Sequence, residues 1–373
     1  MRLTVISAFL CIVLWATGSR AQNWNADYYQ DDTDSSITIR NIHFFRNLEY
    51  FGRIVEGYTL PGTHLRANSH FALYDGMSVD AGVSLLKFWG DPLPMKVEPY
   101  LRLSYQYSER FQLVLGRIRE YMHYDFVAPL YSPERNLTHP NEYGLQIITH
   151  TARWQTETWI NWEKFIVHNS PFQEEFALGH SQKWFFDIPA TQAFSLELQN
   201  IITHKGGQID NDPNPVQSIA NAAIGVNVLW RPLGEMQLHS RAFLLAYADV
   251  SPLKKLPYIY GRGYLAQQSF AFRNLELGLQ YWYGDFFITT RGDYLYQSMS
   301  TFQQDYTEPQ RSLLKTSIAH HTIIHQVLWI RSYLDVIFDT YNERQDIAFG
   351  VEAYLKLNEK WFMRKIKEIP DSK

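Results

Sequence analysis

The sequence predicts an all-β protein, a transmembrane antiparallel β-barrel of about 16 strands within a range of roughly 14–18. Stretches in which apolar and polar residues alternate recur through most of the 373-residue chain. Beyond the N-terminal segment, no apolar run approaches the roughly 20 residues that a membrane-spanning helix needs. Aromatic residues make up 16% of the chain, and many stand near the ends of these stretches, as in the aromatic girdles of membrane barrels.

The stretch 96–107 illustrates the alternation. Side chains of successive strand residues point to opposite faces, so every second residue belongs to one face. One face is apolar and the other polar, with the members Val97, Pro99, Leu101, Leu103, Tyr105 and Tyr107 opposing Lys96, Glu98, Tyr100, Arg102, Ser104 and Gln106. We expect the apolar face to contact lipid and the polar face to line a lumen.

The N-terminus reads as a secretory signal over residues 1–21. Arg2 precedes a short apolar segment, and Ser19 and Ala21 supply small residues at the expected cleavage site. The single cysteine, Cys11, lies inside this segment, so the sequence predicts no disulfide and no thiol chemistry in the mature chain. Residues 22–48 are interpreted either as a periplasmic lead-in or as a plug of the barrel.

The barrel is expected over residues 49–358, followed by a basic tail at 359–373. Tight turns at Pro61-Gly62 and Asp75-Gly76 separate the first strands. Longer polar connections are expected at 121–141, 206–217 and 298–311. The expected strands are 49–59, 63–73, 77–85, 96–107, 111–120, 143–147, 152–162, 172–182, 191–204, 220–231, 236–246, 260–272, 275–283, 286–297, 313–329 (one strand or two), 333–339 and 346–357.

A soluble β-sandwich or propeller would also show alternation. The long apolar sets, the aromatic residues near strand ends and the strongly polar second face favour the membrane barrel, because a sandwich would have to bury all its apolar faces together.

The pattern resembles the porin-like β-barrels of the Gram-negative outer membrane over residues 49–358. The resemblance implies export to the outer membrane and contact with its lipid. The chain departs from such barrels by continuing past Leu357. Either Trp361 or Phe362 closes the last strand, or the basic tail is a separate periplasmic element.

Charged residues on the polar faces are the candidate pore-lining groups. They would either tune the passage of solutes or fill a narrow lumen with ion pairs. The candidates are Arg66, Asp80, Lys96, Glu98, Arg102, Arg153, Glu157, Glu197, Arg241, Glu276, Arg291 and Asp293.

The long connection 121–141 is the candidate constriction, since connections of this length are uncommon unless functional or disordered. The alternative is an external loop without a role in gating. The candidate residues are Tyr121, His123, Tyr124, Asp125, Tyr131, Glu134 and Arg135.

Catalytic and metal-binding patterns are weak. His168 and Ser170 lie close together but beside a proline, and His180 and Ser181 would point to opposite faces of a strand. His320-His321 lacks a carboxylate at a ligand-like offset, and Asp210 and Asp212 fit a solvated loop better than a calcium site. The sequence therefore predicts no enzyme, no metal and no cofactor, with a hydrolase of lipid or polysaccharide as a lesser alternative.

The net charge of −4 argues against a nucleic-acid partner. The leading hypothesis is an outer-membrane channel for passive passage of small hydrophilic solutes. The alternative is a structural or binding barrel that engages a surface polysaccharide, another glycan or a secretion partner.

Overall fold

A computed structural model describes residues 37–119, 125–186, 192–232 and 234–359. The expected signal segment 1–21, the first part of the lead-in and the closing aromatics Trp361 and Phe362 lie outside these residues. No helix within the described residues has the length and apolar character needed to cross a membrane.

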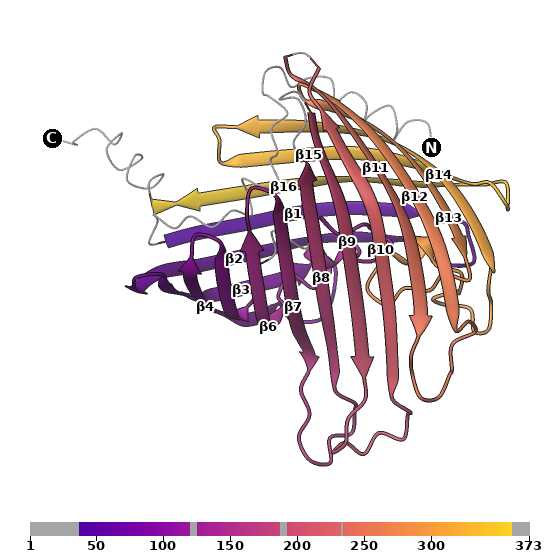
Figure 1. The fold of residues 1–373 in the computed structure, drawn as a ribbon, viewed down its shortest axis with the longest axis horizontal. Coiled ribbons are helices and arrows are strands. Elements are labelled where there is room, and N and C mark those ends of the chain that lie inside the picture. Colours follow the sequence, from indigo (N-terminus) through magenta and orange to yellow (C-terminus); the bar gives the residue numbers. More distant parts are fainter. Residues whose placement is uncertain (1–36, 120–124, 187–191, 233, 360–373) are drawn as a thin grey trace.

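The strands form one closed antiparallel barrel in which each strand pairs with its neighbours in sequence and β1 pairs with β16. Figure 1 shows β6 to β10 side by side along the near wall. The strands are β1 (Ile37–Glu49), β2 (Tyr58–Tyr74), β3 (Met77–Phe88), β4 (Lys96–Ser108), β5 (Phe111–Arg117), β6 (Tyr143–His150), β7 (Trp154–Lys164), β8 (Glu175–Phe186), β9 (Gln192–Lys205), β10 (Gln217–Trp230), β11 (Met236–Asp249), β12 (Tyr260–Phe272), β13 (Leu275–Asp285), β14 (Gln310–Ile324), β15 (Leu328–Asp339) and β16 (Arg344–Asn358). The expected class of fold and the expected number of strands are therefore confirmed.

The connections divide the barrel into two rims. Tight turns, such as the one at Gly76 with its positive φ of 74°, join even-numbered strands to the next strand. Most connections after odd-numbered strands are longer, and Figure 1 shows those after β7 and β9 projecting below the wall. We call these edges the short-turn rim and the long-connection rim. The start of β1 and the end of β16 both lie at the short-turn rim, beside one another.

Alternation sets the two faces of the wall. Apolar side chains such as Leu101, Leu244 and Leu279 are exposed on the outside, whereas Arg102 and Glu197 are buried inside. Large aromatic side chains near strand ends, including Trp162 and Tyr107, also face outward. The apolar-out, polar-in pattern expected from the sequence is therefore present on these strands.

Some expected boundaries differ from the structure. The barrel begins at Ile37 rather than residue 49, because β1 hydrogen-bonds to both β2 and β16 and closes the sheet. Residues 286–297 are not a strand but the first part of a connection to β14 that contains the short 3-10 helix η2 (Tyr294–Tyr296). Arg153 lies in the turn before β7 and is exposed, not on the polar face of the strand.

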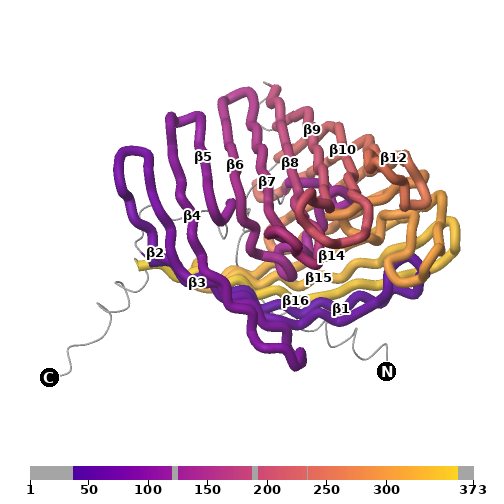
Figure 2. The backbone as a smooth tube through the Cα atoms, turned by 90° about the horizontal axis from the view of Figure 1, so that it is seen from below, coloured from indigo at the N-terminus to yellow at the C-terminus, as the bar shows by residue number. Residues whose placement is uncertain are grey.

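The lumen is not uniformly polar. Within the described residues, an apolar cluster inside the barrel joins the walls of β7 to β15 to segments of the β5–β6 and β13–β14 connections. Figure 2, which views the tube from below, shows chain crossing the interior of the ring of strands. The interior is therefore partly filled by the protein's own connections.

Candidate functional site

Two long connections meet inside the barrel. The Ser132 amide donates to the Arg291 carbonyl at 2.8 Å, and the Asp293 amide donates to the Ala128 carbonyl at 2.8 Å. A Cβ atom on Gly292 would lie 2.0 Å from the Pro129 carbonyl oxygen, so this close approach requires glycine. The β5–β6 and β13–β14 connections therefore behave as one backbone-paired unit within the lumen.

Apolar side chains hold this unit against the wall. Val127 and Leu130 of the first connection are fully buried in the cluster that contains Trp159 of β7 and Trp282 of β13. The Tyr131 ring lies edge-to-face on Trp159 with centroids 6.3 Å apart. Burial of such large side chains is the dominant favourable term in folding, so we expect this unit to keep its position.

Polar contacts anchor the first connection to the wall. The Lys183 ammonium lies 2.7 Å from the Asp125 carboxylate, and Gln199 donates to the Asp125 carbonyl at 3.0 Å while accepting from the Val127 amide at 2.9 Å. Burial alone would raise the pKa of Asp125, but the Lys183 charge overrides it and holds this pKa below its usual value. The Asp125 carboxylate is therefore ionised at neutral pH.

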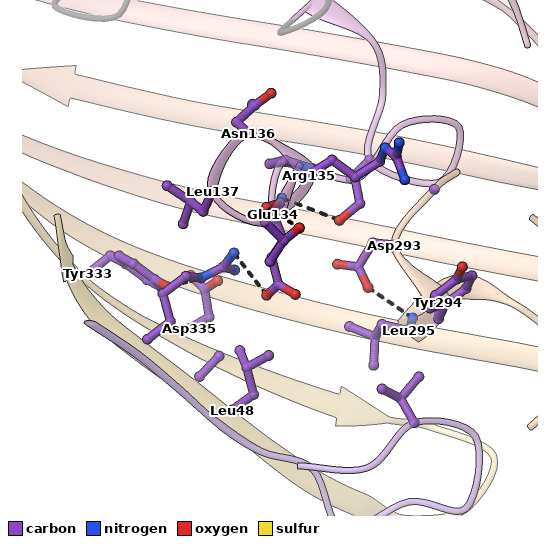
Figure 3. Close-up of a pocket in the computed structure, with 18 of the residues that line it drawn as sticks. Leu48, Glu134, Arg135, Asn136, Leu137, Asp293, Tyr294, Leu295, Tyr333 and Asp335 are labelled. Atoms are coloured by element: carbon purple, nitrogen blue, oxygen red, sulfur yellow. Dashed lines mark hydrogen bonds and ion pairs between the residues drawn. The ribbon is translucent and has the colours of Figure 1, made fainter. Parts of the chain in front are cut away.

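A cavity of about 790 Å³ lies between this unit and the wall. Figure 3 shows Glu134 and Asp293 entering it from the two connections, with Tyr333 and Asp335 of β15 opposite. Its lining combines carboxylates, cations and tyrosines, including Arg46, Tyr58, Glu134, Asp293, Lys315, Arg331, Tyr333, Asp335 and Glu352. Such a polar cavity suits a hydrophilic solute.

The carboxylates of the two connections have shifted pKa values. Burial raises the pKa of Glu134 above its usual value, although Arg46 opposes this from 3.1 Å. Burial also raises the pKa of Asp293, whose carboxylate accepts from the Leu295 amide at 2.9 Å. At the long-connection rim, Glu163 pairs with Arg135 at 3.0 Å and with Arg291 at 2.6 Å.

The structure places the candidate pore-lining residues in several environments. Arg66, Asp80, Glu98, Arg102, Glu157, Glu197, Arg241 and Glu276 stand on inward-facing positions of strands, and Lys96 is an exposed residue at the start of β4. Glu197 is fully buried between Arg241 at 3.0 Å and Lys183 at 3.8 Å. Arg291 and Asp293 reach the lumen from a connection, not from a strand.

Four candidate constriction residues fold into the barrel, namely Asp125, Tyr131, Glu134 and Arg135, the last at the start of the short helix α3 (Arg135–Thr138). Tyr121, His123 and Tyr124 lie outside the described residues. The inward course of the described part favours the constriction over an external loop.

The outer wall carries a histidine–serine pair that the sequence analysis did not identify. His204 of β9 and Ser218 of β10 are directly opposite, and the His204 Nδ1 atom lies 2.9 Å from the Ser218 hydroxyl. Their neighbours Thr203 and Ile219 are buried inside, so both members of the pair face outward. A hydroxyl bonded to an imidazole is the arrangement of an activated nucleophile and its base.

The surroundings of this pair are aromatic and charged. Phe176 stacks on His204 with ring centroids 4.9 Å apart, and Trp162 lies 5.8 Å from Phe176. Lys164 and Lys205 stand at the same rim and both pair with Glu175, at 2.7 and 3.2 Å. In the described part of the chain, no carboxylate bonds to His204, so the pair lacks an orienting acid.

Other polar groups also face outward. On β1 and β2, the Thr59 hydroxyl donates to Asn47 at 2.7 Å, and the Asn47 amide donates to Glu49 at 3.2 Å. On β7 and β8, the His180 Nδ1 atom lies 2.9 Å from the Thr158 hydroxyl. The first group lies at the long-connection rim and the second near mid-height of the wall.

The pairs considered from the sequence do not form sites. Ser181 is buried inside while His180 faces outward, and the Ser170 hydroxyl accepts from the Val167 amide in a loop. His321 points inward to Glu276 at 3.2 Å, away from His320. No group of three or more metal-ligating side chains converges among the residues that the structure describes. The sequence does carry one signal for His204 and Ser218. Each is a polar residue at a position of its strand where every second residue is otherwise mostly apolar and faces outward.

Comparison with known proteins places the chain in a family. The family model described as "Lipid A 3'-O-deacylase-type" matches residues 28–366. The chain belongs to this family. No curated protein matches the chain.

Solved structures share the fold at low sequence identity. Similar chains are OmpTdeltaL8, a loop L8 deletion mutant of the Vibrio cholerae outer membrane protein OmpT (10% identity, TM-score 0.53, 87% of this chain and 100% of that one), and OprD of Pseudomonas aeruginosa (10%, 0.52, 92% and 96%). An anion-selective porin from Comamonas acidovorans is similar as well (10%, 0.52, 87% and 100%). The porin-like barrel expected from the sequence pattern is thereby confirmed as the fold.

The family membership corrects one expectation. The sequence analysis predicted that the protein is not an enzyme, and that prediction was wrong because the family is named for a deacylase activity. The catalytic patterns sought in the sequence were pairs of residues close together in the chain, and side chains that meet across neighbouring strands, as His204 and Ser218 do, leave no such pattern.

Proposed function

We propose that this protein is an outer-membrane hydrolase that removes an acyl chain from a phosphorylated glycolipid such as lipid A. The observation that carries the proposal is the outward-facing His204–Ser218 pair, at 2.9 Å, in a member of a deacylase-type family. A lipid ester reaches the barrel from outside, so a catalytic pair for it belongs on the outer wall.

The chemistry requires a base and a nucleophile. His204 Nδ1 accepts the Ser218 hydroxyl proton as Oγ attacks the ester carbonyl carbon. The sugar oxygen leaves with that proton, and the acyl chain remains on Ser218. Water then attacks the acyl-serine, His204 takes the water's proton and returns it to Oγ, and the fatty acid departs.

The position of the pair fits the ester of a membrane lipid. His204 stands one residue from the end of β9 at the long-connection rim, beside the rings of Phe176 and Trp162. Aromatic girdles mark the boundary between headgroups and hydrocarbon, where acyl esters lie. Lys164 and Lys205, both about half exposed (48% and 46%), would attract the phosphate groups of such a glycolipid.

Release of fatty acid tests the proposal. Folded full-length protein in vesicles containing lipid A is expected to liberate fatty acid. Mass spectrometry would measure the amount of fatty acid released over time. Ser218→Ala and His204→Ala should each lower the rate by roughly 10²–10⁴-fold. Ser240→Ala, which alters an outward hydroxyl on β11, is the matched control and should leave the rate unchanged.

Two outcomes would revise the proposal. No release by the wild-type chain from any acylated glycolipid would overturn the hydrolase function. Release that survives Ser218→Ala but is lost in Thr59→Val or Asn47→Ala would keep the function and move the site to β1 and β2.

A second candidate function is passage of small hydrophilic solutes through the lumen. The polar cavity of about 790 Å³ beside the paired connections supports it, as does the likeness of the fold to porins. Stable current steps in a planar bilayer are expected, and Glu163→Gln, which removes the carboxylate that Arg135 and Arg291 share, should enlarge them. A bilayer that stays sealed with folded protein would exclude this function.

A further inference from the structure

A row of polar side chains crosses the outer wall near its mid-height. Thr158 of β7 is directly opposite His180 of β8, and His180 is directly opposite Asn200 of β9. Their sequence neighbours Trp159, Gly179 and Ile201 are buried inside, so the row faces outward. Gln182 lies two residues beyond His180 on β8, so its side chain also faces outward and extends this polar row.

The row lies far from both rims. His180 has five residues of β8 on one side and six on the other, which corresponds to roughly 16–20 Å of strand in each direction. At the usual tilt of a barrel strand, this depth falls near the centre of an apolar band about 25 Å tall. Lipid headgroups do not reach this depth.

Some side chains in the row have donors and acceptors without a hydrogen-bond partner among the described residues. His180 Nδ1 is bonded to the Thr158 hydroxyl, but the side-chain amides of Asn200 and Gln182 bond to no other described residue. By contrast, Ser240 and Gln268, an outward polar pair on β11 and β12, satisfy each other at 2.6 Å. Amides left in hydrocarbon without partners are costly, so the structure calls for a polar surface covering the row.

We propose that a second copy of this chain covers the polar row, forming a two-fold symmetric dimer through β7, β8 and β9. Two copies inserted in the same orientation present Thr158, His180 and Asn200 at the same depth. A two-fold axis along the membrane normal then brings each row against its equivalent. An amide both donates and accepts, so Asn200 is complementary to its own symmetry mate.

The adjacent surface allows close approach. Ala222 of β10 is directly opposite Asn200, and Ala220 lies at the next outward position. Small residues beside polar ones are the usual composition of protein contacts inside membranes, where packing and hydrogen bonds replace the hydrophobic drive. The lumen cavity lies inside the barrel, so the proposal is independent of solute passage. His204 stands on the same outward face of β9, four residues from Asn200 toward the long-connection rim, so the proposed contact lies nearer the middle of the wall than the His204–Ser218 pair and leaves both of its residues unchanged.

Disulfide trapping tests the contact directly. In a Cys11→Ser background, which leaves no other cysteine in the chain, Asn200→Cys should cross-link to its symmetry mate on mild oxidation in outer-membrane vesicles. Ser240→Cys on β11 is the control and should remain monomeric. A cross-link to a different protein, or equal cross-linking of both variants, would overturn the proposal.

A second measurement covers the case in which the cysteine geometry is unfavourable. Asn200→Leu removes the unpaired amide while suiting a lipid-facing position, so the barrel should still fold and keep its heat-modifiable gel mobility. Each substitution removes its contact twice in a symmetric dimer, and the dimer dissociation constant in detergent should rise roughly tenfold or more. A wild-type chain that is monomeric in vesicles and unaffected by Asn200→Leu would overturn the dimer.

Discussion

The carboxylate of Asp125 lies 2.7 Å from the Lys183 ammonium, and this contact fixes the start of the β5–β6 connection to the wall of β8. Lys183 also lies 3.8 Å from Glu197, which is fully buried and pairs with Arg241. Removing a partner of a buried carboxylate is costly, so this network holds the connection inside the barrel.

Asp125→Asn should loosen this connection without unfolding the barrel. About half of the Asp125 side chain remains exposed (49%), so we expect a loss of only about 1 kcal/mol. Limited proteolysis of the β5–β6 connection in vesicles should become faster. Lys164→Gln, which removes an ion pair at the rim, should leave this rate unchanged, and equal acceleration in both variants would contradict the anchoring role.

Acidification should release the same anchor. The lowered pKa of Asp125 means that its stabilising contribution is complete above the usual aspartate value of about 3.9 and is lost as pH falls through the lower value. Protease sensitivity of the connection should therefore rise below about pH 4 in the wild-type protein. In Asp125→Asn this rise should be reduced, and an unchanged pH profile would argue against the assignment.

Glu134 and Asp293 should make the folded protein less stable as pH rises, opposite to the effect of Asp125. Because their pKa values are raised, the protonated forms are favoured in the folded chain, and stability falls as pH increases from the usual carboxyl values through the raised ones. Glu134→Gln and Asp293→Asn should therefore flatten the pH dependence of unfolding by urea in this window. A steeper dependence in either variant would contradict the sign.

Gly292→Ala should separate the two paired connections. The added Cβ would lie 2.0 Å from the Pro129 carbonyl oxygen, which forces backbone displacement at a cost of roughly 1–3 kcal/mol. Hydrogen exchange of the Asp293 amide should accelerate. Gly278→Ala is a milder control, since its Cβ would meet the Ser317 side chain at 3.2 Å, and equal effects of the two variants would rule out the explanation.

Lys164→Gln combined with Lys205→Gln should raise KM for a phosphorylated glycolipid more than for its dephosphorylated form. The two ammonium groups lie at the rim near His204 and would bind phosphate, while Ser218 and His204 remain intact. Rates of fatty acid release measured over a range of substrate concentrations would check this. A purely kcat effect, equal for both substrates, would mean that the lysines do not recognise phosphate.

The sequence by itself determined the faces of the wall. Strand side chains alternate, so parity alone placed Leu101 outside and Arg102 inside, and the recurrence of such stretches gave a barrel of about 16 strands. The same parity also marks His204 and Asn200 as polar residues at outward positions. Parity alone does not say which residues of neighbouring strands lie opposite them.

Only the tertiary structure decided which residues meet. Pairing of His204 with Ser218, and of His180 with Asn200, depends on the register between neighbouring strands, which alternation within a strand does not encode. The inclusion of β1 in the barrel likewise depends on its hydrogen bonds to β16 at the far end of the chain. The inward course of the β5–β6 and β13–β14 connections rests on packing between distant segments, such as Gly292 against Pro129, and local sequence carries no record of such contacts.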